Sequence, residues 1–179
     1  MKSLKLYFIA DMITEWRTRA VLPHVNGKLL DLGCGINKLI KKYKNGIGVD
    51  VFQFGDADLI VKDTSKLPFE NKNFDTITIL AALNHIPNKA EVLKEVKRVL
   101  KDGGKLIITM IPPGIGKIWH KFNKNLWDRD QQIRGMAHEE DYGLTKKEIS
   151  KILKSAGFKI IKEKRFMLFI NRLTIAEKI

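Results

Sequence analysis

Residues 29–37 read LLDLGCGIN, a stretch in which an apolar run ends at a turn containing two glycines one residue apart. The continuous apolar run over 28–32 is typical of a strand buried inside a parallel sheet. Gly33 and Gly35 allow the backbone to turn tightly and to approach a ligand, and Asn37 tolerates a left-handed conformation better than most residues. The stretch therefore predicts a buried strand that leads directly into a ligand-binding turn.

Short apolar runs alternate with helix-like segments along the rest of the chain. We predict further strands at 47–51, 57–63, 74–80 and 105–111, and helices over the first 20 residues and at 37–44, 89–101 and 145–157. Strands that alternate with helices form a parallel sheet with right-handed crossovers. The last two segments, 158–166 and 172–179, predict an antiparallel strand pair. The predicted fold class is therefore α/β, with a Rossmann-like, mostly parallel central sheet and a C-terminal antiparallel strand pair.

Local signals place the ends of some of these helices. Thr145 followed by Glu148 predicts a capping box at the start of the last helix. The run DGG at 102–104 predicts the end of the helix over 89–101, since glycine commonly follows a helix. The first helix is expected to be amphipathic, with an apolar face made of Leu6, Ile9, Ile13 and Trp16.

The composition excludes several classes of protein. Hydrophobic residues make up 44% of the chain and charged residues 30%, which is ordinary for a globular protein and unlike a disordered one. No apolar run approaches the roughly 20 residues needed to cross a bilayer, and the first residues do not read as a signal peptide. The single cysteine, Cys34, excludes an internal disulfide, so the cytoplasm is the expected compartment.

The net charge of +13 lies at the two ends of the chain, with +5 in the first 50 residues and +8 in the last 79. Positive ends can attract nucleic acid, anionic lipid or an acidic substrate. However, 26 of the 33 basic residues are lysine, and no arginine-rich or aromatic-interleaved patch stands out. This distribution favours a solvated, lysine-rich surface over a nucleic-acid interface.

The glycine turn does not fit the common phosphate-binding motifs. A dinucleotide-binding turn reads G-x-G-x-x-G, and here Lys38 occupies the position of the third glycine. A Walker loop, G-x-x-x-x-G-K-[ST], is absent from the chain. The turn therefore favours a ligand that carries no phosphate at this point.

Acidic residues at the ends of neighbouring strands narrow the class of ligand further. Asp50 ends the second predicted strand, 19 residues after Asp31, and an acid there can accept hydrogen bonds from a ribose diol. Asp63 ends the third predicted strand, where it can accept from an amino group such as that of adenine. These carboxylates suit a nucleoside without phosphates, and S-adenosylmethionine, an adenosine joined to a cationic methionine sulfonium, fits this description.

Taken together, the motifs resemble a known family. LLDLGCGIN, IGVD, VKDTSKLPFENKNFDTITILAALNHI and EVLKEVKRVLKDGGKLIITMIPP are similar to the motifs of class I S-adenosylmethionine-dependent methyltransferases of the type 11 group. The resemblance is dense over 28–112 and loose over 145–178. The family usually has a third glycine where Asn37 stands, which is the main departure from its pattern.

The resemblance implies roles for residues at the strand ends. It implies that the loop from Asp31 to Asn37 wraps the methionine part, that Asp50 holds the ribose, and that Asp63 with Thr64 meets the adenine. The residues expected to bind the cofactor are Asp31, Leu32, Gly33, Cys34, Gly35, Asn37, Asp50, Val51, Asp63, Thr64, Leu80, Ala81 and Ala82.

The chain is long enough for one domain, which we divide into four parts. These are an N-terminal helix (1–22), a cofactor-binding core (28–111), a substrate-covering segment (112–144) and a C-terminal helix with strands (145–179). His85 is the candidate general base or acceptor contact, because it follows the fourth predicted strand. The candidate acceptor-binding residues are Tyr7, Trp119, His120, His138 and Tyr142.

The motifs that are absent bound the acceptor. The chain has AALNHIP after the fourth strand in place of the NPPY-like run of amino-methylating DNA enzymes, and it has no second cysteine for cytosine C5 chemistry. No metal is expected, because the acids of HEED (138–141) do not have a ligand spacing. The preferred acceptor is a small molecule that is anionic or lipid-linked.

Three alternatives remain open from the sequence. The basic ends are compatible with a methyltransferase that acts on RNA, although nucleic acid is not favoured. A protein that binds S-adenosylmethionine without catalysis carries the same motifs. The N-terminal helix is also compatible with a peripheral membrane enzyme, and nothing in the sequence specifies an oligomeric state.

Overall fold

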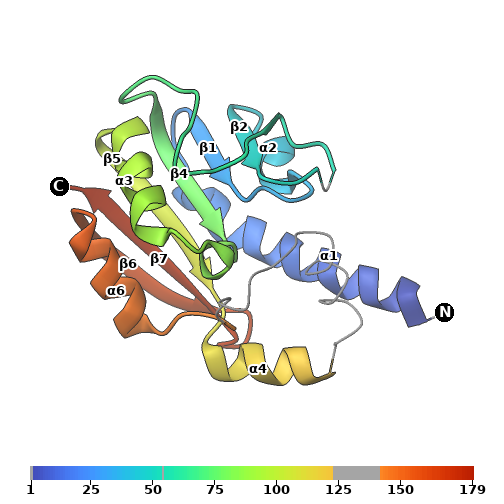
Figure 1. The fold of residues 1–179 in the computed structure, drawn as a ribbon. Helices are drawn as coiled ribbons and strands as arrows, with labels where there is room; N and C mark the ends of the chain where they lie inside the picture. Colours follow the sequence, from blue (N-terminus) through green and yellow to red (C-terminus); the bar gives the residue numbers. More distant parts are fainter. Residues whose placement is uncertain (1, 54, 123–141) are drawn as a thin grey trace.

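A computed structural model describes residues 2–53, 55–122 and 142–179 of the chain (Figure 1). A seven-stranded sheet runs through it in the order β3-β2-β1-β4-β5-β7-β6. Strands β1 to β5 are parallel, and β7 pairs antiparallel with both β5 and β6. The strands are β1 (Leu29–Leu32), β2 (Gly46–Asp50), β3 (Leu59–Ile60), β4 (Phe74–Leu80), β5 (Leu100–Met110), β6 (Phe158–Phe166) and β7 (Asn171–Lys178).

Helices cover both faces of this sheet, as an α/β fold requires. The helices are α1 (Lys2–Val21), α2 (Lys38–Tyr43), α3 (Lys89–Val99), α4 (Pro113–Phe122) and α6 (Lys146–Ser155), with short 3₁₀ turns at η1 (Leu22–His24) and η2 (Leu83–His85). The chain order reverses direction across the sheet between β1 and β4, which lie side by side. In open α/β sheets this switch point, at the carboxyl ends of the strands, is where ligands bind.

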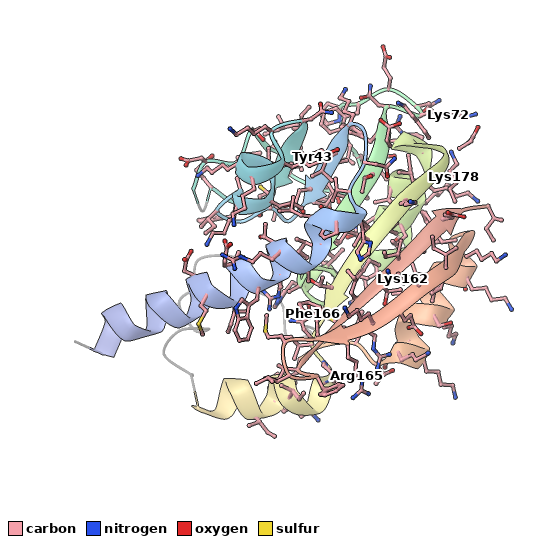
Figure 2. All side chains as sticks on the ribbon, turned by 180° about the vertical axis from the view of Figure 1, so that it is seen from behind. Tyr43, Lys72, Lys162, Arg165, Phe166 and Lys178 are labelled. Atoms are coloured by element: carbon pink, nitrogen blue, oxygen red, sulfur yellow. The ribbon has the colours of Figure 1, made fainter. Side chains whose placement is uncertain are left out.

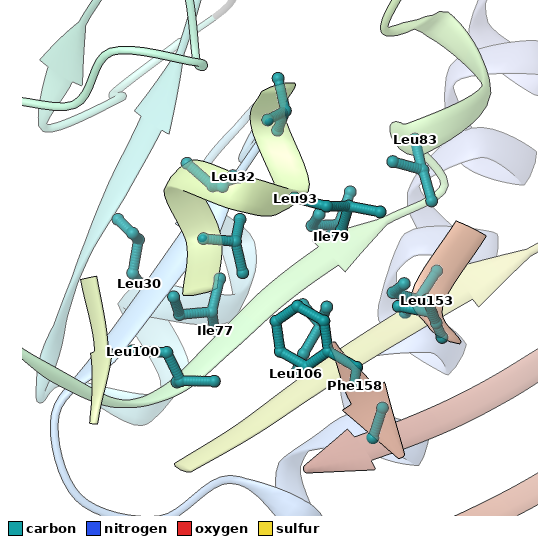
Figure 3. Close-up of a cluster of buried hydrophobic side chains, with 14 of the residues drawn as sticks. Leu30, Leu32, Ile77, Ile79, Leu83, Leu93, Leu100, Leu106, Leu153 and Phe158 are labelled. Atoms are coloured by element: carbon teal, nitrogen blue, oxygen red, sulfur yellow. The ribbon is translucent and has the colours of Figure 1, made fainter. Parts of the chain in front are cut away.

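Two apolar cores hold the layers together, one on each face of the sheet. On one face, α3 and α6 bury Leu93 and Leu153 against strand residues such as Ile77, Ile79 and Phe158 (Figure 3). On the other face, Val21 of α1 and residues of α2 pack against β1, β5 and β7. Burying the sheet on both sides explains why its central strands read as continuous apolar runs.

The predicted strand pattern is confirmed, with one element much shorter than expected. The strand over 74–80 has the predicted bounds, and the closing antiparallel pair is present. The third strand spans only Leu59–Ile60 of the predicted 57–63, and it pairs with β2 through two residues. The sheet edge is therefore short, a common way in which proteins limit the exposure of unpaired strand edges.

The prediction that DGG ends a helix is wrong. Helix α3 ends at Val99, and the residues from Leu100 onward are already extended. Gly103 adopts a φ of +71° within β5, close to a register shift between β4 and β5. The glycines thus serve an irregularity in a strand, where left-handed glycine is also common.

The predicted apolar face of the first helix is wrong at Trp16, while Ile13 is half-buried and the side chains of Leu6 and Ile9 lie outside the described residues. Trp16 is 42% exposed, whereas Thr18 and Val21 are 1% and 0% exposed. Helix α1 therefore turns the face of Thr18 and Val21 toward the sheet, because the sheet lies along its C-terminal half.

The capping box of α6 is confirmed. Thr145 Oγ1 accepts a hydrogen bond from the Glu148 backbone N–H (3.2 Å), and Glu148 Oε2 accepts one from the Thr145 backbone N–H (2.7 Å). Across the described parts of the chain, no helix is both long and apolar enough to cross a membrane.

Candidate active site

The loops that follow β1 and β4 touch each other at the switch point. Gly33 has a φ of +72°, and its backbone N–H donates to the Val49 carbonyl of β2 (2.8 Å). A Cβ placed on Gly33 would lie 2.6 Å from the Cβ of Ala82, in the loop after β4. Only a glycine allows this approach, so the first glycine of the motif is required by packing as well as by backbone conformation.

Gly35 joins the loop after β1 to the end of β2. Its backbone N–H donates to Asp50 Oδ2 (2.8 Å), while nothing lies within 4 Å of where its Cβ would be. Asp50 Oδ1 accepts from the backbone N–H groups of Val51 (2.8 Å) and Phe52 (3.3 Å). A carboxylate offers about four acceptor positions, so Asp50 retains about one for a ligand beside the open space at Gly35.

Asn37 has the predicted left-handed conformation, with φ 58° and ψ 31°. Its side chain points into the protein, where Nδ2 donates to the Asp56 carbonyl (2.7 Å) and to Asp58 Oδ2 (3.0 Å). Its Oδ1 fills the space above Gly48 of β2, where a Cβ would lie only 2.0 Å away. The Asn37 side chain thus supports the loop from within, and its backbone shapes the turn in place of the family's third glycine.

Asp31 is a buried carboxyl group at the centre of the site. It is 3% exposed, and Thr78 of β4 donates a hydrogen bond to its Oδ1 (2.6 Å). Burial raises the pKa of Asp31 to about 7, with a further increase from the charge of Asp50 and a partly opposing effect of the Thr78 hydrogen bond. The protein therefore holds near this turn a carboxyl group that a neighbouring positive charge would ionise.

Asp63 acts as a turn former as well as a candidate ligand contact. Its carboxylate accepts from the Ser65 N–H (2.8 Å), the Ser65 hydroxyl (2.6 Å) and the Asn88 side-chain amide (3.3 Å). The hydrogen bonds from Ser65 hold the pKa of Asp63 below its usual value. Thr64 beside it is buried.

The loop after β4 has an unusual backbone. Ala81 adopts a φ of +53°, which is rare for a residue other than glycine, and its N–H donates to the Thr109 carbonyl of β5 (3.0 Å). Leu80 and Ala82 on either side are half-buried. Leu32 is fully buried, Val51 is exposed beside Asp50, and burial raises the pKa of the Cys34 thiol, which makes Cys34 a packing residue and not a nucleophile.

His85 lies at the end of η2, close to this loop. Its ring Nε2 is 3.1 Å from the side-chain Nδ2 of Asn84, and its backbone N–H donates to the Ala82 carbonyl (2.9 Å). An amide nitrogen only donates, so Nε2 of His85 is the acceptor in this arrangement. The lone pair that a general base needs is thus engaged by Asn84.

The structure describes only part of the predicted acceptor set. Tyr142 is exposed, and its backbone carbonyl packs against Gly116 of α4. The side chains of Tyr7, Trp119 and His120, together with His138 and the HEED run, lie outside the described residues. Over the described residues, no group of histidines, cysteines and acids has the arrangement of a metal site.

Ion pairs tie α1 to α2 beside the glycine loop. Lys38 Nζ contacts Asp11 Oδ1 (2.6 Å), and Lys42 pairs with Glu15. The hydrogen bonds from Lys42 and Arg19 lower the pKa of Glu15 to about 2. These contacts place the N-terminal helix against α2, which directly follows the glycine turn and begins at Lys38, the residue that replaces the glycine of a dinucleotide motif.

Comparison with known proteins agrees with this geometry. A family model for a methyltransferase domain matches residues 30–108. A demethylmenaquinone methyltransferase from Thermotoga maritima is 30% identical over an alignment of 186 positions, gaps included. The alignment covers 87% of this chain and 81% of that protein. The chain belongs to the class I S-adenosylmethionine-dependent methyltransferases. The methyltransferase motifs identified from the sequence are thereby confirmed.

Two further similarities are narrower in what they show. A sterol 4-C-methyltransferase from Caenorhabditis elegans is 34% identical over 102 residues, which cover 46% of this chain and 30% of that protein. The crystal structure of an S-adenosylmethionine-dependent methyltransferase from Thermotoga maritima has a TM-score of 0.74 at 14% identity, and covers 99% of this methyltransferase and 95% of that chain. The second similarity concerns the fold alone.

The residues present fit S-adenosylmethionine, the cofactor of the family. The open space at Gly35 admits a ligand, Asp50 retains acceptor capacity, and Asp31 is a carboxyl group that a cation would ionise. This donor set suits a cationic nucleoside, and the turn matches neither of the phosphate-binding motifs tested above.

Sequence reasoning missed three residues that shape the site. Thr78 bonds Asp31, Gly48 leaves room for Asn37, and Asp58 accepts hydrogen bonds from both Asn37 and the Gly48 N–H (2.7 Å). Thr78 is a polar residue inside an apolar strand and lies directly beside Asp31 in the sheet register. That pattern was a usable signal, because a polar side chain in a buried strand needs a partner.

We predict that Gly33→Ala abolishes measurable binding of S-adenosylhomocysteine and destabilises the protein. The new Cβ would collide with Ala82, which adds about 1–3 kcal/mol to the cost of the left-handed backbone. Gly103→Ala is the matched control, because Gly103 has nearly the same φ (+71°) and nothing within 4 Å of its Cβ position. Urea unfolding and calorimetric titration measure both effects, and equal losses in the two variants would contradict the packing argument.

We also predict a stability change that depends on the protonation of Asp31. Its pKa is raised in the folded state to about 7 from 3.8, so the folded protein holds a proton that the unfolded chain has lost between about pH 4 and 7. The free energy of unfolding therefore falls as the pH rises through this window, by at most about 1.4 kcal/mol per pH unit.

Asp31→Asn isolates this contribution, because asparagine cannot titrate. The free energy of unfolding is measured in urea from pH 4 to 8 without ligand. The wild-type value minus the value of the variant should fall as the pH rises and level off above about pH 7. Taking the difference cancels the opposite contribution of His24, whose pKa is lowered mainly by burial. A difference that does not change with pH would show that Asp31 is ionised in the folded protein.

Proposed function

We propose that this methyltransferase acts on a small lipophilic acceptor. The observation that carries this proposal is a group of exposed apolar side chains at the end of the sheet where β4 and β5 finish. They come from α1, α4 and the turn between β6 and β7, which gather at this end of the molecule (Figures 1 and 2). The members are Met12, Trp16, Ile118, Leu168, Phe169 and Ile170.

The turn between β6 and β7 is the most exposed part of this group. Leu168 and Phe169 are 82% and 70% exposed. Met167, Leu168 and Phe169 all have positive φ values, between 51° and 66°. Such conformations cost free energy in residues other than glycine and are enriched at functional sites. Large apolar side chains are thus exposed on a backbone conformation that costs free energy, and we interpret this as support for an apolar ligand.

The names of two relatives support the same class of acceptor. Demethylmenaquinone and sterols, named for the Thermotoga maritima and Caenorhabditis elegans proteins, are lipophilic molecules. The described structure contributes no contrary feature such as an appended nucleic-acid-binding module. The acceptor class for this chain is therefore inferred from its own exposed apolar residues and agrees with those names.

The proposed roles at the cofactor follow the site geometry. The loop from Asp31 to Asn37 holds the methionine part, Asp50 and Val51 the ribose side, and Asp63 with Thr64 the adenine. S-adenosylmethionine supplies an activated methyl group on a positively charged sulfur. The contribution of the protein is to align the acceptor with that methyl group and to exclude water, which on its own can supply several kcal/mol of the barrier reduction.

A labelled-methyl transfer assay tests the acceptor class. The full-length protein is incubated with methyl-labelled S-adenosylmethionine and, separately, with lipid extract, aqueous metabolites and total RNA. We expect label in the lipid fraction. Label in RNA that depends on low salt would assign the basic ends to nucleic acid instead, and cofactor binding without transfer to any fraction would indicate a binding protein.

Matched variants connect the assay to the apolar group. Phe169→Ser should raise the KM for the lipid acceptor, because it removes an exposed apolar contact at the proposed site. Ile161→Ser, at an exposed apolar position within β6, should leave the KM unchanged. Equal effects of the two substitutions would contradict a role for the turn.

We propose His85 as an acceptor contact, because Asn84 engages its Nε2. His85→Gln should raise the KM for the acceptor found above while kcat falls only a few-fold, with no change in the pH dependence of kcat between pH 6 and 8. Loss of about 100-fold in kcat together with loss of a pH limb would instead identify His85 as the general base.

A further inference from the structure

Arg17 lies in the C-terminal half of α1 and has no role in the site described so far. It lies one helical turn before Val21, on the same side of the helix, and Val21 is buried in the core formed with Ile107 and Leu173. Figure 2 looks onto this face, where α1 crosses the sheet. Burial lowers the pKa of the Arg17 guanidinium to about 10.

The Arg17 guanidinium has no partner among the described residues. Its Nε is enclosed and makes no hydrogen bond. The side chain as a whole is only half-buried. Its terminal nitrogens are neither enclosed nor hydrogen-bonded within the described structure, and are therefore open to solvent. Arg19, two residues further on, instead pairs with Glu15 (2.7 Å) on the exposed side of the same helix.

Other unpartnered polar atoms lie on the same face of the sheet. Thr109 of β5 is directly opposite Leu173 of β7, and Asn171 lies two residues before Leu173, so all three side chains share the face of Val21. The Thr109 hydroxyl and both polar atoms of the Asn171 amide are buried without a hydrogen-bond partner. These atoms lie toward the carboxyl ends of the strands, where Leu80 is the neighbour of Thr109.

Arg17 therefore carries an enclosed N–H group that makes no hydrogen bond, which destabilises the folded protein, while its terminal nitrogens stay open to a ligand. Its planar fork of N–H donors matches a carboxylate better than any other side chain does. The exposed apolar side chains of Met12 and Trp16, on the same helix, would contact the hydrocarbon part of a ligand.

From this combination we infer that Arg17 binds a carboxylate, or a similar planar anion, on the lipophilic acceptor. The inference rests on the proposed function and specifies its substrate class as amphiphilic and anionic, with the negative group held at α1.

The test uses dodecanoate as the anionic probe and dodecanol as its uncharged counterpart. Binding to the full-length protein is measured by calorimetry with S-adenosylhomocysteine at saturation. We expect Arg17→Gln to weaken dodecanoate binding on the order of 10- to 100-fold and to leave dodecanol and S-adenosylhomocysteine binding within about twofold. Arg19→Gln, the control on the same helix, should leave all three unchanged.

A second variant separates binding from folding. Arg17→Met should raise the Tm of the ligand-free protein, because it removes an enclosed N–H group without breaking a hydrogen bond. A lower Tm of Arg17→Met would overturn the inference. So would an Arg17→Gln variant that keeps its dodecanoate affinity, or one that loses S-adenosylhomocysteine binding and not dodecanoate binding. Failure to methylate any lipid, with anion binding through Arg17 intact, would contradict the acceptor class alone.

Discussion

The close approach of the loop after β1 to its neighbours is the constraint on which the site depends. Gly33 packs against Ala82 of the loop after β4, and the Gly35 N–H holds the carboxylate that ends β2. Three strand ends are thereby fixed to one another at the place where the sheet order reverses. The open space beside Gly35, the buried Asp31 and the unusual backbone of Ala81 all follow from this junction.

Two ionisable groups, one buried and one half-buried, give the site its chemical character. Asp31 is a carboxyl group whose ionisation a positive charge would favour, which suits the cationic cofactor of this family. Arg17, on the other face of the switch point from the α3 and α6 core, is a cation without a carboxylate partner among the described residues. The raised pKa of Asp31 reduces the stability of the ligand-free fold at neutral pH, and in our proposals each of the two groups meets a ligand of opposite charge.

The predictions from sequence succeeded where local pattern and tertiary demand agree. The strand over 74–80, the Thr145 capping box and the left-handed Asn37 are each set by residues within a few positions of one another. The errors arose where packing decides between alternatives that look alike locally. The DGG run suits a helix end or a strand irregularity equally well, and the buried side of α1 depends on where the sheet lies against it.

The sequence alone determined the family, the glycine turn after β1 and the succession of most strands and helices along the chain, although not α4, because these depend on short-range periodicity, glycine placement and motif spacing. Only the tertiary structure decided which polar groups meet. The contact of Asp31 with Thr78 and the packing of Gly33 against Ala82 join residues that lie far apart in the chain, and folding likewise decides that Arg17 has no partner among the described residues. The physical reason is that burial and hydrogen-bond satisfaction are properties of packed surfaces brought together by folding, and they do not exist in any segment by itself.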